Sequence, residues 1–345
     1  MGPLRRALTR LDRTGVEPVA WKPPPAPRET SVPTFDLDTV ERWPLPGSTG
    51  PEDVAVDSEG RVVAGTDDGA IWRFDGPASV TRIADTGGRP LGIEVLADGR
   101  YLVCDADRGL LRVDDSGRVD VLTDTAAGSP LLLCNNAAVD SAGVVYFTDS
   151  SARFRLAEHR LDAIEHSGTG RLIRFDPATG DTDILLAGLQ FGNGVGLAAD
   201  ESYLLVAETA GYAIRRVDLR GPTAGTATTW VDNLPGFPDN VASQTDGGIF
   251  WVALYSPRLP ALDRLAPYPA LRIVAANLPD RLAPQPILRG RVLGFDGDGT
   301  VVHDLRGDRD SYAPVTGVRE SGGRLYLGSL TADAVACLPA PTPPV

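Results

Sequence analysis

The sequence has few of the side chains that usually carry covalent or proton-transfer chemistry. Its 345 residues include one lysine, Lys22, and three histidines, His159, His166 and His303. A lone lysine in a proline-rich stretch excludes a Walker-type phosphate loop and a Schiff-base lysine in a buried pocket. Three scattered histidines argue against a histidine-rich zinc site and against most Ser-His-Asp triads. Asp, Glu and Asn remain as the plentiful candidates for chemistry.

Cysteine and positive charge are also scarce. Cys104, Cys134 and Cys337 are widely spaced and form no CxxC pair, so they predict neither a disulfide framework nor a zinc ribbon. We expect Cys134, although it precedes Asn135, to be a small buried apolar side chain. The 33 basic and 46 acidic residues give a net charge of −13, which argues against nucleic acid as a partner.

Long apolar runs are missing as well. No apolar segment of a signal peptide follows the first arginines, and no run of 18 apolar residues occurs anywhere. These absences predict a soluble, cytoplasmic protein with no membrane partner. The proline-rich residues 1–33 predict an extended N-terminal arm in front of a single domain formed by residues 34–345.

The body of the chain is built from similar units. In each unit, short Val, Leu, Ile and Tyr-rich runs alternate with Asp-Gly or Ser-Gly turns, the pattern of antiparallel hairpins, and helical periodicity is nearly absent. The units cover residues 51–75, 90–114, 135–151, 192–218, 239–254 and 315–338.

Six such units predict an all-β fold, a six-bladed β-propeller with four-stranded antiparallel blades. Long steps between units indicate insertions at residues 152–170 and 255–288, which we expect on one face as lids or rim loops. His159 and His166 lie in the first insertion and are predicted to be rim residues. Residues 34–45 are the candidate for the strand that closes the ring with the last blade.

The predicted innermost strands begin with oxygen-bearing side chains at equivalent positions. In a propeller these positions surround the central channel, so the side chains are expected to converge there. Two carboxylates and three carboxamides form the kind of all-oxygen set that suits Ca²⁺, although another divalent cation could take its place. The predicted ligands of this central metal site are Glu52, Asn135, Asn193, Asp239 and Asn240.

Several strings identify a family resemblance over residues 48–338. GPEDVAVD, GNGV, LLVAETAGYAIRRV, LPGFPDNV and RLYLGSL resemble the strictosidine synthase-like and adipocyte plasma membrane-associated protein family. This family is grouped with the gluconolactonases, regucalcin and the paraoxonases, which are calcium-dependent six-bladed propellers. The resemblance therefore implies the same fold and the same central calcium, held by the five side chains above.

The resemblance also implies details that this chain alters. A second calcium would use Asp53, the Ile93 carbonyl and Asn136, where paraoxonases have an aspartate. Leu91 stands where lactonases of this type have a histidine. The blade-six glutamate of strictosidine synthases is matched by Thr316, with Glu320 further along the strand.

These observations favour a calcium-dependent hydrolase of a lactone or aryl ester. The cation would polarise the carbonyl, and Asp239 is the candidate base or nucleophile. His303 is a second catalytic candidate if its ring points into the channel mouth. Apolar residues at the mouth predict a small apolar or aromatic substrate. The predicted pocket residues are Leu91, Phe191, Phe237 and Tyr255.

Two other functions stay open. One is a strictosidine synthase-like enzyme that forms bonds or cyclises its substrate. The other is a propeller that binds a ligand without catalysis. Fold alone does not decide among the three.

Overall fold

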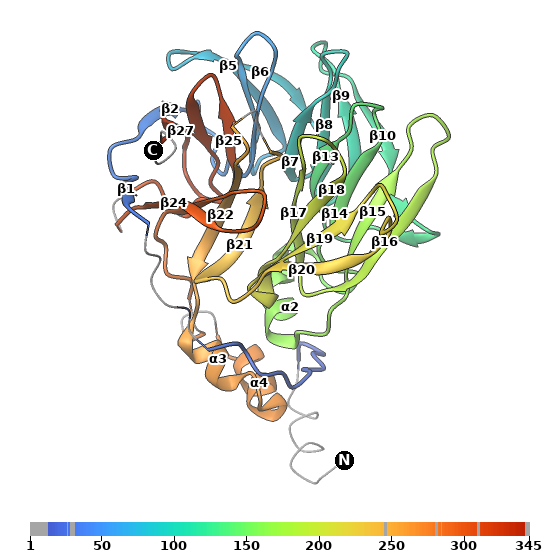
Figure 1. Ribbon diagram of the computed structural model, residues 1–345, viewed down its shortest axis with the longest axis vertical. Helices are drawn as coiled ribbons and strands as arrows, with labels where there is room; N and C mark the ends of the chain where they lie inside the picture. The colour runs from blue at the N-terminus through green and yellow to red at the C-terminus, as the bar shows by residue number, and fades with distance from the viewer. Residues whose placement is uncertain are drawn as a thin grey trace.

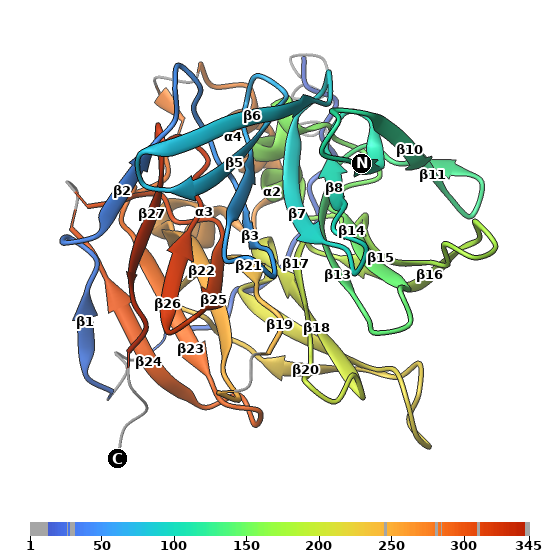
Figure 2. The same cartoon turned by 90° about the horizontal axis from the view of Figure 1, so that it is seen from above.

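Six antiparallel sheets stand around a central axis (Figure 2). The structure is a computed structural model, and it describes residues 13–25, 27, 32–244, 247–279, 282–283, 285–308 and 311–341. Part of the predicted N-terminal arm, residues 1–12, 26 and 28–31, lies outside the described residues. The predicted all-β, six-bladed propeller with four-stranded antiparallel blades is confirmed.

In each blade the strands are given from the axis outward. Each of the first four blades consists of four strands that follow one another in the sequence. Blade one contains β3 (Val54–Val56), β4 (Val62–Gly65), β5 (Ala70–Gly76) and β6 (Ser79–Asp85). Blade two contains β7 (Pro90–Val95), β8 (Tyr101–Asp105), β9 (Gly109–Val113) and β10 (Val119–Thr123). Blade three contains β13 (Cys134–Val139), β14 (Val145–Asp149), β15 (Gly170–Phe175) and β16 (Thr182–Leu189), and blade four contains β17 (Gly192–Leu197), β18 (Tyr203–Glu208), β19 (Ala213–Asp218) and β20 (Ala227–Val231).

The last two blades include strands from the N-terminal part of the chain. Blade five contains β21 (Gly236–Val241), β22 (Phe250–Pro257), β23 (Arg291–Phe295) and β24 (Val301–Arg306), and β1 (Thr34–Asp36) adds to it in parallel. Blade six contains β25 (Val318–Ser321), β26 (Arg324–Leu327), β27 (Ala334–Pro339) and β2 (Glu41–Pro44). A small hairpin, β11 (Thr125–Ala126) with β12 (Ser129–Pro130), lies between blades two and three in the chain.

The second strands of the blades are buried almost throughout. Tyr101–Asp105 and Val145–Asp149 have no exposed residue, and Tyr203–Glu208 is likewise entirely buried. Neighbouring blades cover both faces of such a strand, so these segments are continuous apolar runs and lack the alternation of a half-exposed strand. The hydrophobic core therefore lies between the blades, in a series of separate clusters.

The ring is closed by β2, which pairs antiparallel with β27 as the fourth strand of blade six. Trp43 at the centre of β2 is 7% exposed and packs against Phe74 of blade one and Tyr326 of blade six. This side chain thus joins the first blade to the last. The prediction that residues 34–45 close the ring is confirmed for β2, while β1 extends blade five.

Glycines let the inner strands approach closely around the axis. A Cβ on Gly92 would lie 2.6 Å from the Asn136 Cα, and one on Gly194 would lie 2.1 Å from the Val241 nitrogen. No side chain fits at such distances, so these positions need glycine. The close approach places the polar side chains at the strand starts beside one another.

The two insertions carry short helices, which the near absence of helical periodicity did not predict. The first holds η1 (Leu156–Glu158) and α2 (His159–Glu165), and the second holds α3 (Pro260–Leu265) and α4 (Pro269–Ala276). A further short helix, η2 (Thr209–Gly211), follows β18. α2, α3 and α4 lie together at one end of the propeller (Figure 1). No helix among the described residues has the length and apolar character needed to cross a bilayer.

We predict that Trp43→Ala lowers the free energy of unfolding by about 3 kcal/mol, because it leaves a cavity at the seam between the first and last blades. Urea denaturation followed by circular dichroism measures this change. Val121→Ala, on a residue of β10 that is 47% exposed, is the control and should cost less than about 0.5 kcal/mol. Equal stability of both variants would contradict the role of this seam.

Candidate functional site

A small cavity lies where the inner strands begin. It has a volume of about 80 Å³, and residues at the start of the innermost strands of several blades line it. Four of the predicted ligands line it together, with apolar neighbours at their sides. Those four ligands are Glu52, Asn135, Asn193 and Asp239. The other polar residues of the lining are His159, Thr209 and Tyr255, and the apolar ones are Leu91, Leu156, Phe191 and Leu330.

The NH₂ groups of the carboxamides at this site donate hydrogen bonds to other side chains of the protein. Asn135 Nδ2 donates to Ser150 Oγ at 2.9 Å, and the side chain of Asn193 donates to the Asp239 carboxylate. Asn240 does not line the cavity, but its Nδ2 lies 3.2 Å from Glu52 Oε1. These bonds orient all three carboxamides, which leaves their oxygens available.

Four buried oxygens at this place have no hydrogen-bond partner among the residues that the structure describes. They are Oδ1 of Asn135, Asn193 and Asn240 and Oε2 of Glu52. Buried acceptors without a donor are costly, and several of them together indicate that an ion or water completes the site. Because they are oxygens only, they fit a hard divalent cation such as Ca²⁺.

The electrostatics of the site also favour a bound cation. Burial raises the pKa of Glu52 well above its ordinary value, and the carboxylates of Asp239 and Asp53 raise it further. Burial likewise raises the pKa of Asp239 to about 8, against the hydrogen bond from Asn193. Two carboxylates in one buried site disfavour each other's ionised form, and a cation between them removes that penalty. Among the described residues no cluster of three or more His, Cys, Asp and Glu suits a metal, so a cation here depends on the carboxamides.

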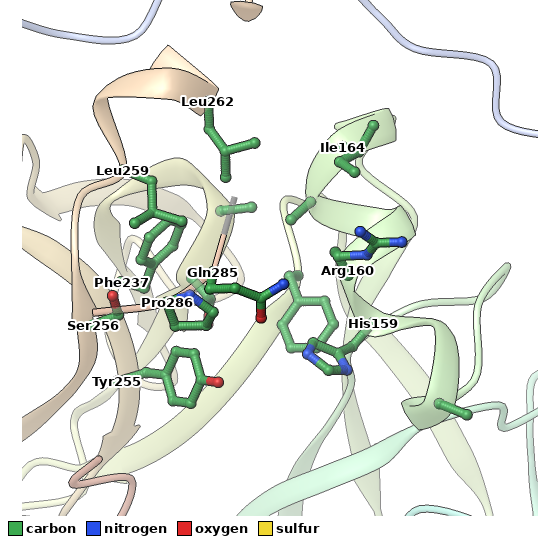
Figure 3. Close-up of a pocket in the computed structure, with 15 residues that line it drawn as sticks. His159, Arg160, Ile164, Phe237, Tyr255, Ser256, Leu259, Leu262, Gln285 and Pro286 are labelled. Atoms are coloured by element: carbon green, nitrogen blue, oxygen red, sulfur yellow. The ribbon is translucent and has the colours of Figure 1, made fainter. Parts of the chain in front are cut away.

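A larger apolar cavity of about 370 Å³ opens next to the small one. Phe191, Thr209 and Tyr255 line both cavities, whereas Phe237 lines only the larger one. Figure 3 shows α2 on one side, with His159 and Arg160, and Leu259, Phe237 and Tyr255 on the other. The four predicted pocket residues are thus divided between the two cavities, with Leu91 in the smaller.

His159 has a place that sequence reasoning missed. It was expected to be one of two rim residues without a role, but it lines both cavities. Its Nδ1 lies 2.8 Å from the Leu156 carbonyl oxygen, so Nδ1 donates there and Nε2 is left as the acceptor. The only available signal was its position in an insertion on the mouth face, because no repeat motif contains it.

His303 lies away from both cavities. It belongs to β24, the fourth strand out from the axis in blade five. It is 2% exposed and stacks on Trp251 with ring centroids 5.3 Å apart, and burial lowers its pKa. The condition for its catalytic role, a ring that points into the channel mouth, is therefore not met, and we assign it no such role. Cys134 is buried, as are the other two cysteines.

The residues of the implied second calcium site have other partners. Asp53 Oδ2 accepts from Asn136 Nδ2 at 2.9 Å and from the Ile93 nitrogen at 3.4 Å, and its Oδ1 accepts from the Val54 nitrogen at 2.8 Å. Asn136 Oδ1 accepts from the Val195 nitrogen at 2.9 Å. These oxygens therefore already have donors, in contrast to those around Glu52.

A half-buried arginine, Arg319, supplies positive charge near Asp53. Arg319 pairs with Glu94, and its Nε lies 3.4 Å from the Val54 carbonyl oxygen. Burial raises the pKa of Asp53 to about 6, and Arg319 opposes that rise. The Asp53 set fits a cation less well than the Glu52 set, because the side-chain oxygens of Asp53 and Asn136 already accept hydrogen bonds and the positive charge of Arg319 acts on Asp53.

Blade six provides no acid to the small cavity among the described residues, and its contribution there is Leu330. Thr316, which the resemblance predicts to match the strictosidine synthase glutamate, is 1% exposed and donates to the Glu52 carbonyl oxygen at 2.7 Å. Glu320 accepts from Trp251 Nε1 at 2.6 Å and lines neither cavity.

The sequence matches two family descriptions, "Strictosidine synthase" over residues 135–222 and "Strictosidine synthase-like, N-terminal" over residues 35–74. It is 32% identical to the adipocyte plasma membrane-associated protein of Bos taurus, covering 96% of this chain and 86% of that protein. It is 34% identical to strictosidine synthase-like protein 6 of Arabidopsis thaliana, covering 81% and 76%. The chain belongs to the strictosidine synthase-like family.

Solved structures with this fold come from more distant proteins. A gluconolactonase from Xanthomonas campestris superposes with a TM-score of 0.65 at 18% identity, covering 94% of this strictosidine synthase-like chain and 99% of that one. A calcium-binding protein, regucalcin, from Agrobacterium tumefaciens superposes with a TM-score of 0.62 at 14% identity, covering 92% and 99%. At such identities the likeness establishes the propeller fold alone.

We predict that Ser150→Ala weakens Ca²⁺ binding by about 10–100-fold, since the Asn135 carboxamide loses the partner that orients it. Isothermal titration calorimetry on chelator-stripped protein measures the affinity. Ser151→Ala is the matched control, because Ser151 is equally buried but bonds to Thr169 and to the backbone at Phe154. Unchanged affinity in Ser150→Ala would remove Asn135 from the ligand set.

We also predict one Ca²⁺ per chain in the wild type and a gain of a second in Asn136→Asp. That substitution replaces the NH₂ donor facing Asp53 by a carboxylate, so the pair gains charge and needs a cation. Calorimetric stoichiometry and melting temperature with and without Ca²⁺ give the answer. Two equivalents in the wild type would show that the Asp53 set binds metal as it stands.

Proposed function

We propose that this protein is a divalent cation-dependent hydrolase of a lactone or an aryl ester. The observation that carries the proposal is the set of four unpartnered buried oxygens lying beside an apolar cavity of about 370 Å³. Its fold likeness to a gluconolactonase and to a calcium-binding regucalcin supports the same reaction class.

The cation would be held by the side-chain oxygens of Glu52, Asn135, Asn193, Asp239 and Asn240, which form an all-oxygen donor set; an oxygen of each of these residues except Asp239 has no partner among the described residues. A divalent cation bound there supplies Lewis-acid polarisation of an ester or lactone carbonyl. Apart from these ligands, the polar lining of the small cavity consists of His159, Thr209 and Tyr255.

Asp239 is the proposed general base. The Asn193 carboxamide donates to its carboxylate and so restricts its orientation. The carboxylate takes a proton from the attacking water, the oxygen of that water bonds to the carbonyl carbon, and the bond from that carbon to the leaving oxygen breaks. The same proton then passes to the leaving alkoxide or phenoxide, so the reaction consumes one water and Asp239 is restored.

His159 and the aromatic residues are proposed to hold the substrate. Nε2 of His159 is an acceptor at the mouth of the small cavity, because Nδ1 is engaged by Leu156. It can orient a water or a hydroxyl group of the substrate. Phe191, Phe237 and Tyr255 provide an apolar wall that excludes water from the ester and favours an aromatic or aliphatic body over a free sugar acid.

A bond-forming or cyclising reaction is the second candidate, and membership of the strictosidine synthase-like family favours it. The proton-transfer acid expected from blade six is replaced by Thr316, whose hydroxyl is bonded to the backbone of Glu52. That replacement makes hydrolysis the better supported proposal. A small-molecule substrate and a cytoplasmic location remain predictions from the sequence.

We predict that dialysis against EDTA abolishes turnover of a lactone and aryl-ester panel, and that CaCl₂ restores it. We also expect Asp239→Asn, assayed at saturating Ca²⁺, to lower kcat by about 10²-fold or more, since the water loses its base. Asp298→Asn, on an exposed turn of blade five, is the matched control and should behave like wild type. Turnover that survives EDTA would contradict the proposed dependence on a cation. Full activity in Asp239→Asn would show that another residue is the general base.

A further inference from the structure

The described part of the N-terminal arm, residues 13–25, lies across the helices of both insertions (Figure 1). We call this segment the N-terminal strap. Its Val19 nitrogen donates to the Glu165 carbonyl oxygen at the end of α2 at 2.9 Å. Its Trp21 nitrogen donates to the Ala266 carbonyl oxygen after α3 at 3.3 Å. The strap therefore bonds to each of the two insertions.

Two buried arginines of the second insertion hold the strap in place. Arg272 of α4 is 4% exposed, and its Nη1 donates to the Val19 carbonyl oxygen at 2.7 Å. Its Nη2 donates to Ala163 of α2 at 3.2 Å. Arg258 donates to the carbonyl oxygens of Pro24 and Pro25 at 2.9 and 3.2 Å. Pro24 and Pro25 have no N–H group, so their carbonyl oxygens are the only backbone hydrogen-bonding groups that these two residues offer to Arg258.

Trp21 contacts residues behind both walls of the larger cavity. On one side its ring stacks on His166, the residue that ends α2, with centroids 3.9 Å apart and an angle of 11° between the ring planes. On the other side it lies 6.0 Å from the ring of Tyr212, which in turn lies 5.0 Å from the ring of Phe237. Trp21 also packs against the cluster formed by Tyr212, Phe237 and Leu259.

The two walls that Trp21 touches are the ones that line the cavity. α2 presents His159, Arg160, Ala163 and Ile164 to it, and the opposite wall presents Phe237 and Leu259 (Figure 3). Val16 of the strap adds a second contact to the α2 wall, since it is 3% exposed and packs with Ile164.

We propose that Trp21 of the N-terminal strap is a positioning residue that sets the separation of α2 and the Tyr212–Phe237 wall, and hence the fit of an apolar ligand. The indole fills the space behind the cavity, so its removal lets the walls move without touching the cation ligands. For turnover this rests on the proposed hydrolase function, whereas for ligand binding it stands alone.

The test compares wild type with Trp21→Ala and Trp21→Phe. We expect Trp21→Ala to raise KM for 2-naphthyl acetate about tenfold, the scale of a lost aromatic contact, with kcat changed less than about twofold. The dissociation constant of 1-anilinonaphthalene-8-sulfonate, followed by its fluorescence, should rise by a similar factor. Calorimetric Ca²⁺ affinity should be unchanged, and Trp21→Phe should restore most of the KM. If Trp21→Ala does not fold, Trp21→Leu replaces it, with the same expected direction.

Trp230→Ala is the matched control. Trp230 is also half-buried, but it packs on Phe250 and Phe295 between blades four and five and lines neither cavity. The Trp230→Ala substitution should lower the melting temperature without changing KM or the affinity for 1-anilinonaphthalene-8-sulfonate. The proposal is overturned if Trp21→Ala keeps wild-type KM and probe affinity, or if Trp230→Ala shifts them equally. A wild type that hydrolyses no ester refutes the hydrolase, while the probe measurement still decides the role of Trp21.

Discussion

The need to compensate buried oxygen acceptors at the axis governs the rest of this structure. Glu52 and Asp239 are almost fully buried, and three carboxamides turn their oxygens inward beside them. A protein interior penalises such a set heavily unless a positive charge joins it. The fold therefore makes most physical sense as a scaffold that holds these oxygens for a cation.

The neighbouring charges are arranged around that need. Asp53, the residue after Glu52, already accepts hydrogen bonds from Asn136 and from the backbone, and the positive charge of Arg319 acts on it. The two groups of acids differ in whether protein donors reach them, although both are buried. Asn136 supplies an NH₂ donor to Asp53 where an aspartate would supply only acceptors, so the pair is joined by a hydrogen bond.

The fold and the location of the site could be predicted because a propeller repeats its sequence pattern. The recurrence of Glu52, Asn135, Asn193 and Asp239 at one phase of the repeat indicated that they meet at the axis. His159, α2 and the strap could not be found in that way, because they occur once and are placed by tertiary contacts. The orientation of His303 could not be predicted either, because it follows from the pairing of β24 with β23, which puts the residue near the edge of the blade.

The seam between β2 and β27 has a consequence for how the chain folds. Glu41 pairs with Cys337, so the contact that completes the ring joins residues from opposite ends of the sequence. Loop-closure entropy makes such a contact slow to form, and it is rewarded only when the intervening blades are in position. Until then β2 and the outer edge of β27 are unpaired, and a second molecule could bind either of them. Newly made chains are thus most exposed to aggregation and to strand exchange just before closure, and folding at low protein concentration should favour the closed monomeric ring.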